Sequence, residues 1–166
     1  MPKLQEFGKY IVPIGEISEG ATHFNGLEKR EGELYKNNKH VAAFKSMSLA
    51  LDAFCGWLTE VSPLQKVVLA AHNGARFDEP ILRYNANKEG RLTALKNRVE
   101  GFIDTLPVFR AKLPNLTGHN LSSLANELNV PPGEHDAVAD SRCLQSLAEK
   151  AGVTRDELMQ KFSSFK

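Results

Sequence analysis

Two short clusters in this sequence combine residue types that bind metal ions or move protons. The first runs from Ala71 to Asp78 with the sequence AHNGARFD, and the second runs from His135 to Asp140 with the sequence HDAVAD. A histidine at the start of a helix can reach a reacting water, and a carboxylate held by a helix can bind a metal ion. Each cluster also has a structural interpretation, with Asp78 as a helix N-cap and with His135 and Asp140 on a solvated helix face.

The strands expected near these clusters are short runs of β-branched, aromatic or aliphatic residues. We expect strands at residues 6–14, 67–71 and 102–106. The run VVLAA at 67–71 contains no polar residue, which is typical of a strand buried on both faces of a sheet. The first cluster directly follows this strand, and ligand sites in α/β sheets form where strands end.

Helices are expected where apolar residues repeat at steps of three and four and where capping residues precede them. Residues 15–42 are polar and punctuated by glycines, which favours a loop with one helical turn, and residues 107–119 read as a connection. Three expected helices have a capping residue at their start, 44–61 with Ser46, 78–90 with Asp78 and 120–128 with Asn120. A short helix is expected within 91–100 and a longer one at 136–150. In the last expected helix, Thr154 and Glu157 form a capping box, and Leu158 and Phe162 lie on one face.

Strands that alternate with helices indicate an α/β domain, with a mixed or parallel sheet covered by helices. The length of 166 residues fits a single domain, 1–166. No run approaches the ~18 apolar residues of a membrane span, which excludes an integral membrane protein. The N-terminus lacks the apolar core of a secretory signal. We therefore expect an intracellular protein, nuclear or cytoplasmic, whose Cys55 and Cys143 are packed free thiols.

The charge balance restricts how the chain could bind nucleic acid. Lys and Arg number 21 and Asp and Glu number 20, which gives a net charge of +1. This balance argues against a protein that coats nucleic acid through bulk positive charge. It is compatible with a protein that handles a single strand end in a small site.

Taken together, the two clusters resemble motifs of the DEDDh family of 3′–5′ exonucleases, which share the ribonuclease-H-like fold. HNGARFD is similar to motif II of that family, His-Asn-x-x-x-Phe-Asp, and HDAVAD is similar to motif III, His-x-Ala-x-x-Asp. FIDTL resembles the strand between these motifs, LSSL the helix before motif III, and EFGKYIVP with ATHFNGL an early strand and loop. The resemblance covers residues 6–150. AHNGARFDEPIL is closest to the three-prime repair exonucleases, with a remoter likeness to the exonuclease-derived domain of the promyelocytic leukaemia protein.

The resemblance implies a ribonuclease-H-like three-layer α/β domain, with a mixed sheet flanked by helices. It implies hydrolysis of DNA or RNA from a 3′ end by two Mg²⁺ or Mn²⁺ ions. Asp78 would help to bind one ion and Asp140 the other, and His135 would take the proton from the attacking water. Asn73, which would also orient the motif II loop, Arg76 and His72 are the candidate substrate-binding residues. Arg76, Arg83 and Lys39 are either phosphate contacts or solvated charges.

The first motif of that family, an Asp-x-Glu on the first strand, is absent from this chain. The one Glu-x-Glu, Glu31 to Glu33, lies in a polar stretch and is a poor substitute. Two divalent ions carry four positive charges, whereas Asp78 and Asp140 supply two negative ones, and hard cations need enough oxygen ligands. We therefore expect impaired hydrolysis in this chain, with Asp104 as a candidate replacement ligand. Either the chain is shortened or its lineage has lost the motif.

The missing motif also has a consequence for the fold, which should lack the first one or two strands. In the family, the missing strand lies beside the strand that VVLAA resembles, so an exposed strand edge should remain. Residues 7–13 should either pair with 67–71 or lie apart on residual contacts. Two functional alternatives also stay open: a catalytically inactive module that binds nucleic acid or protein, and an unrelated α/β domain whose clusters are caps and surface charges.

Overall fold

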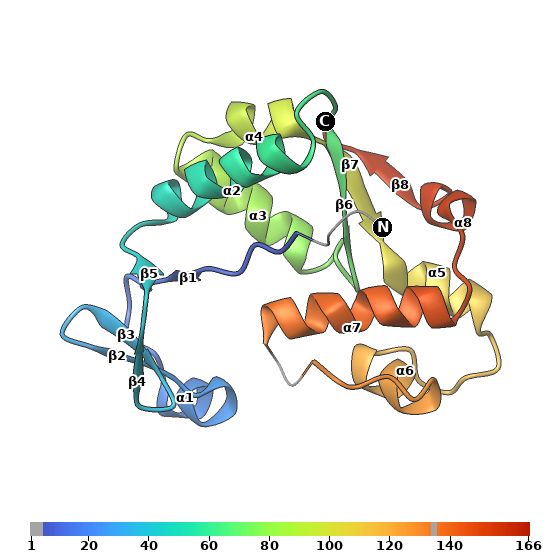
Figure 1. Cartoon of the computed structure of the whole chain (residues 1–166), viewed down its shortest axis with the longest axis horizontal. Helices are drawn as coiled ribbons and strands as arrows, with labels where there is room; N and C mark the ends of the chain where they lie inside the picture. Colours follow the sequence, from blue (N-terminus) through green and yellow to red (C-terminus); the bar gives the residue numbers. More distant parts are fainter. Residues whose placement is uncertain (1–4, 134–135) are drawn as a thin grey trace.

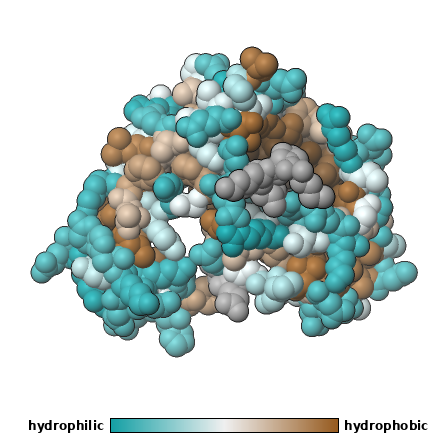
Figure 2. Space-filling model, in the orientation of Figure 1, coloured by the Kyte–Doolittle hydropathy of each residue, from teal (hydrophilic) through white to brown (hydrophobic). Residues whose placement is uncertain are grey.

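The computed structural model describes residues 5–133 and 136–166, which form a main body and a smaller projecting lobe (Figure 1). Apolar surface gathers over the body, whereas the lobe is largely hydrophilic (Figure 2). Within the described residues, none of the helices combines the length and the apolar character that a bilayer crossing requires.

The sheet of the body is mixed and has three strands, β6 (Val67–Ala71), β7 (Val99–Asp104) and β8 (Phe162–Ser164). β6 and β7 run parallel with Leu69 opposite Phe102, and β8 pairs antiparallel with β7. The strand order is therefore β6-β7-β8. A mixed sheet with helices around it agrees with the expected α/β class.

β6 is an edge strand, and the prediction that it is buried on both faces is wrong. None of its residues is buried, and Ala70 is exposed. β7 covers one edge of β6, and no strand among the described residues pairs with the other edge. β7, with a neighbour on each side, is buried over most of its length. The burial of an apolar strand thus depends on its neighbours as well as on its sequence.

The helices of the body form two groups, and each group has its own apolar core. Figure 1 shows the first group beside β6 and the second at the end of β6 and β7 where the strands finish. The first group is α2 (Met47–Val61), α3 (Asp78–Lys88) and α4 (Leu92–Arg98), and the second is α5 (Thr105–Lys112), α6 (Leu121–Glu127) and α7 (Ala137–Lys150). The first core contains Leu51, Leu58, Ala86, Leu95, Val99 and Phe102, and the second contains Phe109, Leu124, Ala125, Val130, Cys143 and Leu147.

Several expected helix starts are confirmed by hydrogen bonds to the capping side chains. Ser46 caps α2 and Asn120 caps α6. α8 (Arg155–Met159) begins with the expected capping box of Thr154 and Glu157. These motifs depend on residues three positions apart, so the sequence alone identifies them.

Three expectations about the bounds and the type of local elements are wrong. Asp78 is the first helical residue of α3, and Phe77 occupies the N-cap position. α5 lies where a connection was expected, because Asp104 caps it and Pro107 fits its first turn, where a missing N–H costs nothing. Phe162 belongs to β8 instead of the last helix.

The lobe replaces the loop expected at residues 15–42. Its three strands form an antiparallel meander in the order β2-β3-β4. Both of its tight turns use two residues with positive φ, Glu31–Gly32 (49° and 77°) and Asn37–Asn38 (50° and 63°), as the type I′ turn of a two-residue hairpin requires. Of the residues in these strands only Leu34 is buried, so they carry little apolar pattern. The elements are α1 (Glu19–Asn25), β2 (Leu27–Arg30), β3 (Glu33–Lys36) and β4 (Lys39–Val41).

The strand expected at residues 6–14 is reduced to β1 (Tyr10–Ile11), which pairs in parallel with β5 (Ala43–Phe44). Residues 7–13 were expected either to pair with 67–71 or to lie apart from them. The second arrangement is confirmed, because this segment does not pair with β6.

Side-chain contacts hold the segment before β1 between two helices. The ring centroid of Phe7 lies 5.6 Å from the rings of both Phe54 and Trp57 on α2. Glu6 forms an ion pair with Arg142 on α7. The N-terminal segment therefore bridges the two helix groups without belonging to the sheet.

Candidate functional site

A tight turn after β6 carries the first cluster to the start of α3. Asn73 has a positive φ of 58°, a left-handed conformation that asparagine adopts more readily than most residues. Gly74 is buried, and a Cβ at this position would lie 2.8 Å from the Cβ of Ala71. The amide of Glu79 donates a hydrogen bond to the carbonyl of Gly74 at 2.9 Å. The turn thus fixes where Asp78 emerges, at the carboxyl end of β6.

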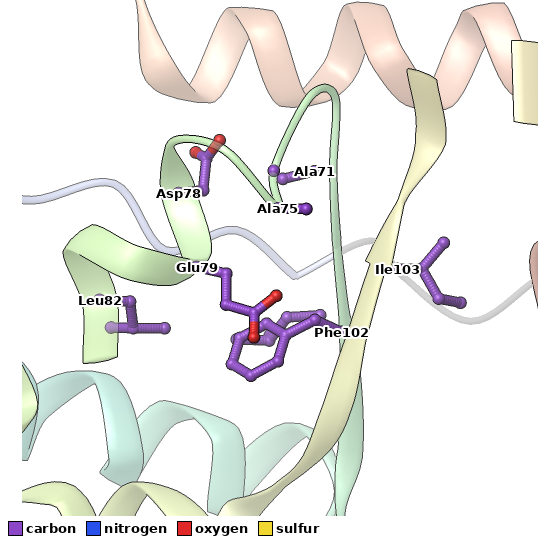
Figure 3. A pocket seen from close by; sticks show the side chains of 9 residues that line it. Ala71, Ala75, Asp78, Glu79, Leu82, Phe102 and Ile103 are labelled. Atoms are coloured by element: carbon purple, nitrogen blue, oxygen red, sulfur yellow. The ribbon is translucent and has the colours of Figure 1, made fainter. Parts of the chain in front are cut away.

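Asp78 presents an exposed carboxylate in the first turn of α3. Its side chain does not cap the helix, and no described residue forms a hydrogen bond or an ion pair with it. Figure 3 shows the Asp78 side chain on the side of α7, whereas Glu79 points toward Phe102.

Asp140 lies in the first turn of α7, where its side chain is half-buried against Gly133. A Cβ at position 133 would lie 1.9 Å from Oδ1 and 2.5 Å from Cα of Asp140. Position 133 therefore has no room for a side chain unless Asp140 moves. Figures 1 and 3 both place the turn after β6 beside α7, which brings together the elements that carry Asp78 and Asp140.

An ion pair between the lobe and the body holds the start of α7. Oδ1 of Asp136 caps α7 by accepting from the amide of Ala139 at 3.1 Å, and Oδ2 accepts from Nζ of Lys36 at 3.0 Å. Lys36 also donates to Oη of Tyr10 at 3.2 Å. The bond from Lys36 lowers the pKa of Asp136, and the bond to Asp136 raises the pKa of Lys36. His135, the proposed base, directly precedes Asp136 and lies outside the described residues.

His72 is engaged by protein groups on both sides of its ring. Nε2 lies 2.6 Å from the carbonyl oxygen of His119, so Nε2 carries the proton, because a carbonyl can only accept. Nδ1 lies 3.0 Å from Oγ1 of Thr105 and accepts from that hydroxyl. Burial lowers the pKa of His72, which keeps the ring neutral. These bonds link the turn after β6 to the start of α5 and to the loop before α6, and they leave neither ring nitrogen free for a substrate.

Asp104, the candidate replacement ligand, accepts one hydrogen bond at each of its two carboxylate oxygens. Oδ1 accepts from the amide of Leu106 at 2.9 Å, and Oδ2 accepts from the amide of Ala75 at 3.3 Å. Asp104 therefore ties the end of β7 to the turn after β6. These two bonds fix the orientation of the Asp104 side chain.

The three candidate cations differ in how firmly they are held. Arg83 pairs with Glu79 at 2.8 Å and lies over the ring of Phe165 at 4.3 Å, so it has a structural role. Arg76 is exposed, and its guanidinium carbon lies 5.5 Å from the ring centroid of Phe77. Lys39 is exposed on β4 in the lobe. Arg76 is therefore the cation that lies next to Asp78 and is free of any ion pair with a described residue.

Two hollows meet at Asp78. A cavity of about 50 Å³ lies between α3 and the sheet and is lined by Leu69 and Phe102, among others (Figure 3). This cavity is far smaller than the ~300–1,000 Å³ pockets that hold drug-sized ligands. A larger groove of about 430 Å³ shares Asp78 and Leu82 with the cavity and runs along α3.

The described residues do not fit a site for two divalent ions. Across residues 5–133 and 136–166, no three Asp, Glu, His or Cys side chains converge where they could hold a metal ion. Asp78 and Asp140 supply two carboxylates, which leaves most of the coordination sphere of one hard cation to water. Asp104, the replacement ligand that the sequence offered, accepts hydrogen bonds from two backbone amides and, among the described residues, belongs to no such group.

Two residues that shape the site were not found from the sequence. Lys36 lies 100 positions before its partner Asp136, and no local motif links them. Gly133 could have been recognised as a small residue just before the second cluster, but its contact with Asp140 requires the folded chain.

Comparison with known proteins identifies the family of this chain. No curated protein matches the sequence. The model of the exonuclease family named for RNase T matches residues 5–147. The matched range contains the turn after β6 and most of α7, and therefore both Asp78 and Asp140. This match rules out the interpretation of the two clusters as caps and surface charges of an unrelated α/β domain, and the chain belongs to the exonuclease family.

Proposed function

We propose that this chain is a 3′–5′ exonuclease-type domain that binds the 3′ end of a nucleic acid and whose own hydrolytic activity is impaired. The observation that carries the proposal is the family match over residues 5–147, which includes Asp78 and Asp140. Within the family, the sequence AHNGARFDEPIL favours the three-prime repair exonucleases.

We assign Asp78 and Asp140 to the binding of Mg²⁺ or Mn²⁺, and His135 to the removal of a proton from water. Binding of the ion should be weak, because two carboxylates offset little of its dehydration cost. Arg76 and Asn73 lie in the turn before Asp78, and we assign them to contact a phosphate of the strand. His72 supports this turn through its bonds to Thr105 and His119.

The impairment is supported by the partners of the other acidic side chains. Asp104 accepts two backbone amides, and Asp136 pairs with Lys36. Glu33, from the one Glu-x-Glu, forms an ion pair with Lys45 and lies within hydrogen-bond distance of His40. Each of these three carboxylates has a partner within the protein, and among the described residues none belongs to a group of three potential metal ligands.

The same shortage of ligands favours a second candidate function, an inactive exonuclease-derived module that binds nucleic acid or protein. Only the impaired exonuclease would hydrolyse a strand. The impaired exonuclease and an inactive module that binds nucleic acid would both bind the end of a strand. A test must therefore measure hydrolysis and binding separately.

The test uses the whole chain with single-stranded DNA and RNA that carry a label at the 5′ or the 3′ end. We expect slow Mn²⁺-dependent shortening from the 3′ end, which Asp140→Asn abolishes and the matched surface variant Asp156→Asn leaves unchanged. Fluorescence anisotropy should show strand binding that Arg76→Ala weakens and Arg155→Ala does not, with a smaller salt dependence for Arg76→Ala.

Each outcome of this test distinguishes the candidates. Binding without hydrolysis in either metal would establish the inactive module. Rapid hydrolysis that depends on Asp140 would remove the impairment from the proposal. A chain that neither binds nor cuts any labelled strand would overturn the nucleic-acid function altogether.

A further inference from the structure

The two halves of α7 are held in different ways. In the second half, Cys143 and Leu147 are buried in the second apolar core. In the first half, residues 137–142, no residue is buried. Asp140 lies in this first half, so the apolar core does not by itself fix the position of the Asp140 carboxylate. The contacts that hold the first half of α7 therefore position Asp140.

Alternate residues of the N-terminal segment face the first half of α7. Glu6 forms an ion pair with Arg142. Gly8 lies against Val138, because a Cβ at position 8 would lie 2.5 Å from Cγ2 of Val138. Phe7, between these two residues, packs on α2 instead. Successive side chains of an extended chain point to opposite sides, so one side of this segment lies on α7 and the other on α2.

Lys36 of the lobe fastens the start of the same half. Its Nζ donates to Oδ2 of Asp136 at 3.0 Å and to Oη of Tyr10 at 3.2 Å, and Tyr10 continues the side of the N-terminal segment that faces α7. Asp136 accepts the amide of Ala139 at Oδ1, and its backbone carbonyl accepts the amide of Asp140 at 2.7 Å. One chain of hydrogen bonds thus joins the N-terminal segment, the lobe and the backbone of Asp140.

We propose that residues 6–10 and Lys36 form a clasp that fixes the first half of α7 and so positions Asp140 at the strand-end site. Glu6, Gly8 and Lys36 are positioning residues, because they act through α7 and not through contact with the nucleic acid. This role rests on the proposed nuclease function, whereas the fastening of α7 by the clasp does not.

The clasp is weak enough to be opened without unfolding the chain. The side chains of both ion pairs are partly exposed, and such pairs contribute little to stability and are screened by salt. The second half of α7 keeps its buried residues when the clasp opens. A change in the clasp should therefore loosen the first half of α7 and leave the second half in place.

The first test changes the contact between Gly8 and Val138. Gly8 has no positive φ, so its backbone accepts alanine and only the contact opposes Gly8→Ala. The added methyl group should displace the first half of α7 and speed hydrogen exchange at the amides of residues 139–142 at least about fivefold. Exchange at residues 143–150 should match the wild-type chain. Val138→Ala removes the opposing Cγ2, so the double variant should exchange more slowly than Gly8→Ala.

The second test reverses the ion pair between Glu6 and Arg142. Glu6→Arg and Arg142→Glu each place two like charges together and should speed exchange at the same amides. The double variant restores opposite charges and should return the exchange toward the wild-type rate. The matched control is Glu149→Arg, at an exposed position in the second half of α7, which should leave exchange at residues 139–142 unchanged.

The strand-shortening assay measures the positioning role. Gly8→Ala and each single charge variant should lower the maximum rate of shortening about tenfold or more, because a small displacement of a site residue has a large effect on rate. Strand affinity by anisotropy should stay unchanged, because Arg76 lies outside the clasp. The two double variants should recover the rate, which a simple loss of stability would not allow, and urea unfolding checks that every variant is folded.

Two results would overturn the proposal. Unchanged exchange at residues 139–142 in Gly8→Ala and in both single charge variants would show that the clasp does not fasten α7. Faster exchange with an unchanged rate of shortening would show that the clasp does not position Asp140, and it would leave the nuclease function intact. If the wild-type chain cuts no strand, the positioning role falls with the nuclease function, and the exchange rates alone decide whether the clasp fastens α7.

Discussion

At the scale of single residues, the site is set by which polar groups are occupied and which are free. Asp104 was a candidate ligand in the sequence and Asp136 lies in the second cluster, and the side chain of each accepts hydrogen bonds within the protein. The carboxylates of Asp78 and Asp140 form no hydrogen bond or ion pair with a described residue. We therefore expect Asp78 and Asp140 to take part in chemistry at this site, and Asp104 and Asp136 to support its structure.

His72 gives a prediction at this scale, because its neutral ring is part of the structure. Burial lowers the folded-state pKa below the unfolded value of about 6.5. The stability that His72 contributes is thus complete above about pH 6.5 and is lost as pH falls through the folded-state pKa. Urea unfolding of the wild-type chain should show a falling free energy of unfolding from pH 7 to pH 5.

His72→Asn should flatten this pH dependence of the free energy of unfolding. The matched control is His23→Asn, at an exposed position, which should leave the pH dependence unchanged. An unaltered slope in His72→Asn would show that the ring is not held neutral by the fold.

At the scale of elements, helices were the easier part to predict and the lobe was the harder part. α2, α6 and α8 begin at the capping residues that the sequence indicated. The meander β2-β3-β4 was not expected, because its strands bury one residue and depend on turns at Glu31–Gly32 and Asn37–Asn38. The lobe is tied to the site through Lys36 on β3 and Asp136 at the start of α7.

Lys36→Met tests this link between the lobe and α7. Both side chains are about one third exposed, so the loss in unfolding free energy should be small, about 0.5–1 kcal/mol, and smaller still in high salt. Asp136 should keep its cap on α7, because the bond from the Ala139 amide does not involve Lys36.

Hydrogen exchange should show faster exchange in β3 and at the start of α7 for this variant. Lys39→Met, at an exposed neighbouring position, is the control and should match the wild-type chain. Equal exchange rates in all three proteins would show that the ion pair carries no coupling between lobe and body.

At the scale of the whole molecule, the C-terminal segment completes the first core. β8 adds the third strand to the sheet, and Phe165 beyond it packs with its ring centroid 5.0 Å from that of Phe102. The guanidinium of Arg83 lies over the Phe165 ring at 4.3 Å. This end of the chain lies outside the residues that match the family model, 5–147.

Phe165→Ala should destabilise the chain by about 2 kcal/mol. This cost is below the ~3–5 kcal/mol of a fully buried phenylalanine, because Phe165 is half-buried. Chemical denaturation measures the change, and Met159→Ala, at an exposed position, should stay within ~0.5 kcal/mol of wild type. A loss for Phe165→Ala no larger than that of the control would show that the C-terminal segment does not support the core.

The sequence by itself determined the family, the strand and turn of the first cluster, and several helix starts. These features depend on residues close together in the chain, such as VVLAA before HNGARFD, or Thr154 with Glu157. For residues 7–13 the sequence left two arrangements open, pairing with residues 67–71 or lying apart from them, and the structure decided for the second.

Tertiary structure alone decided the burial of β6, the pairing of Lys36 with Asp136, and the use of Asp104 and His72 as internal supports. These depend on neighbours that lie far away in the sequence, across 100 positions in the case of Lys36 and Asp136. A carboxylate has the same identity in the sequence whether it is free or bonded, and only the position of its donors in the folded chain decides which.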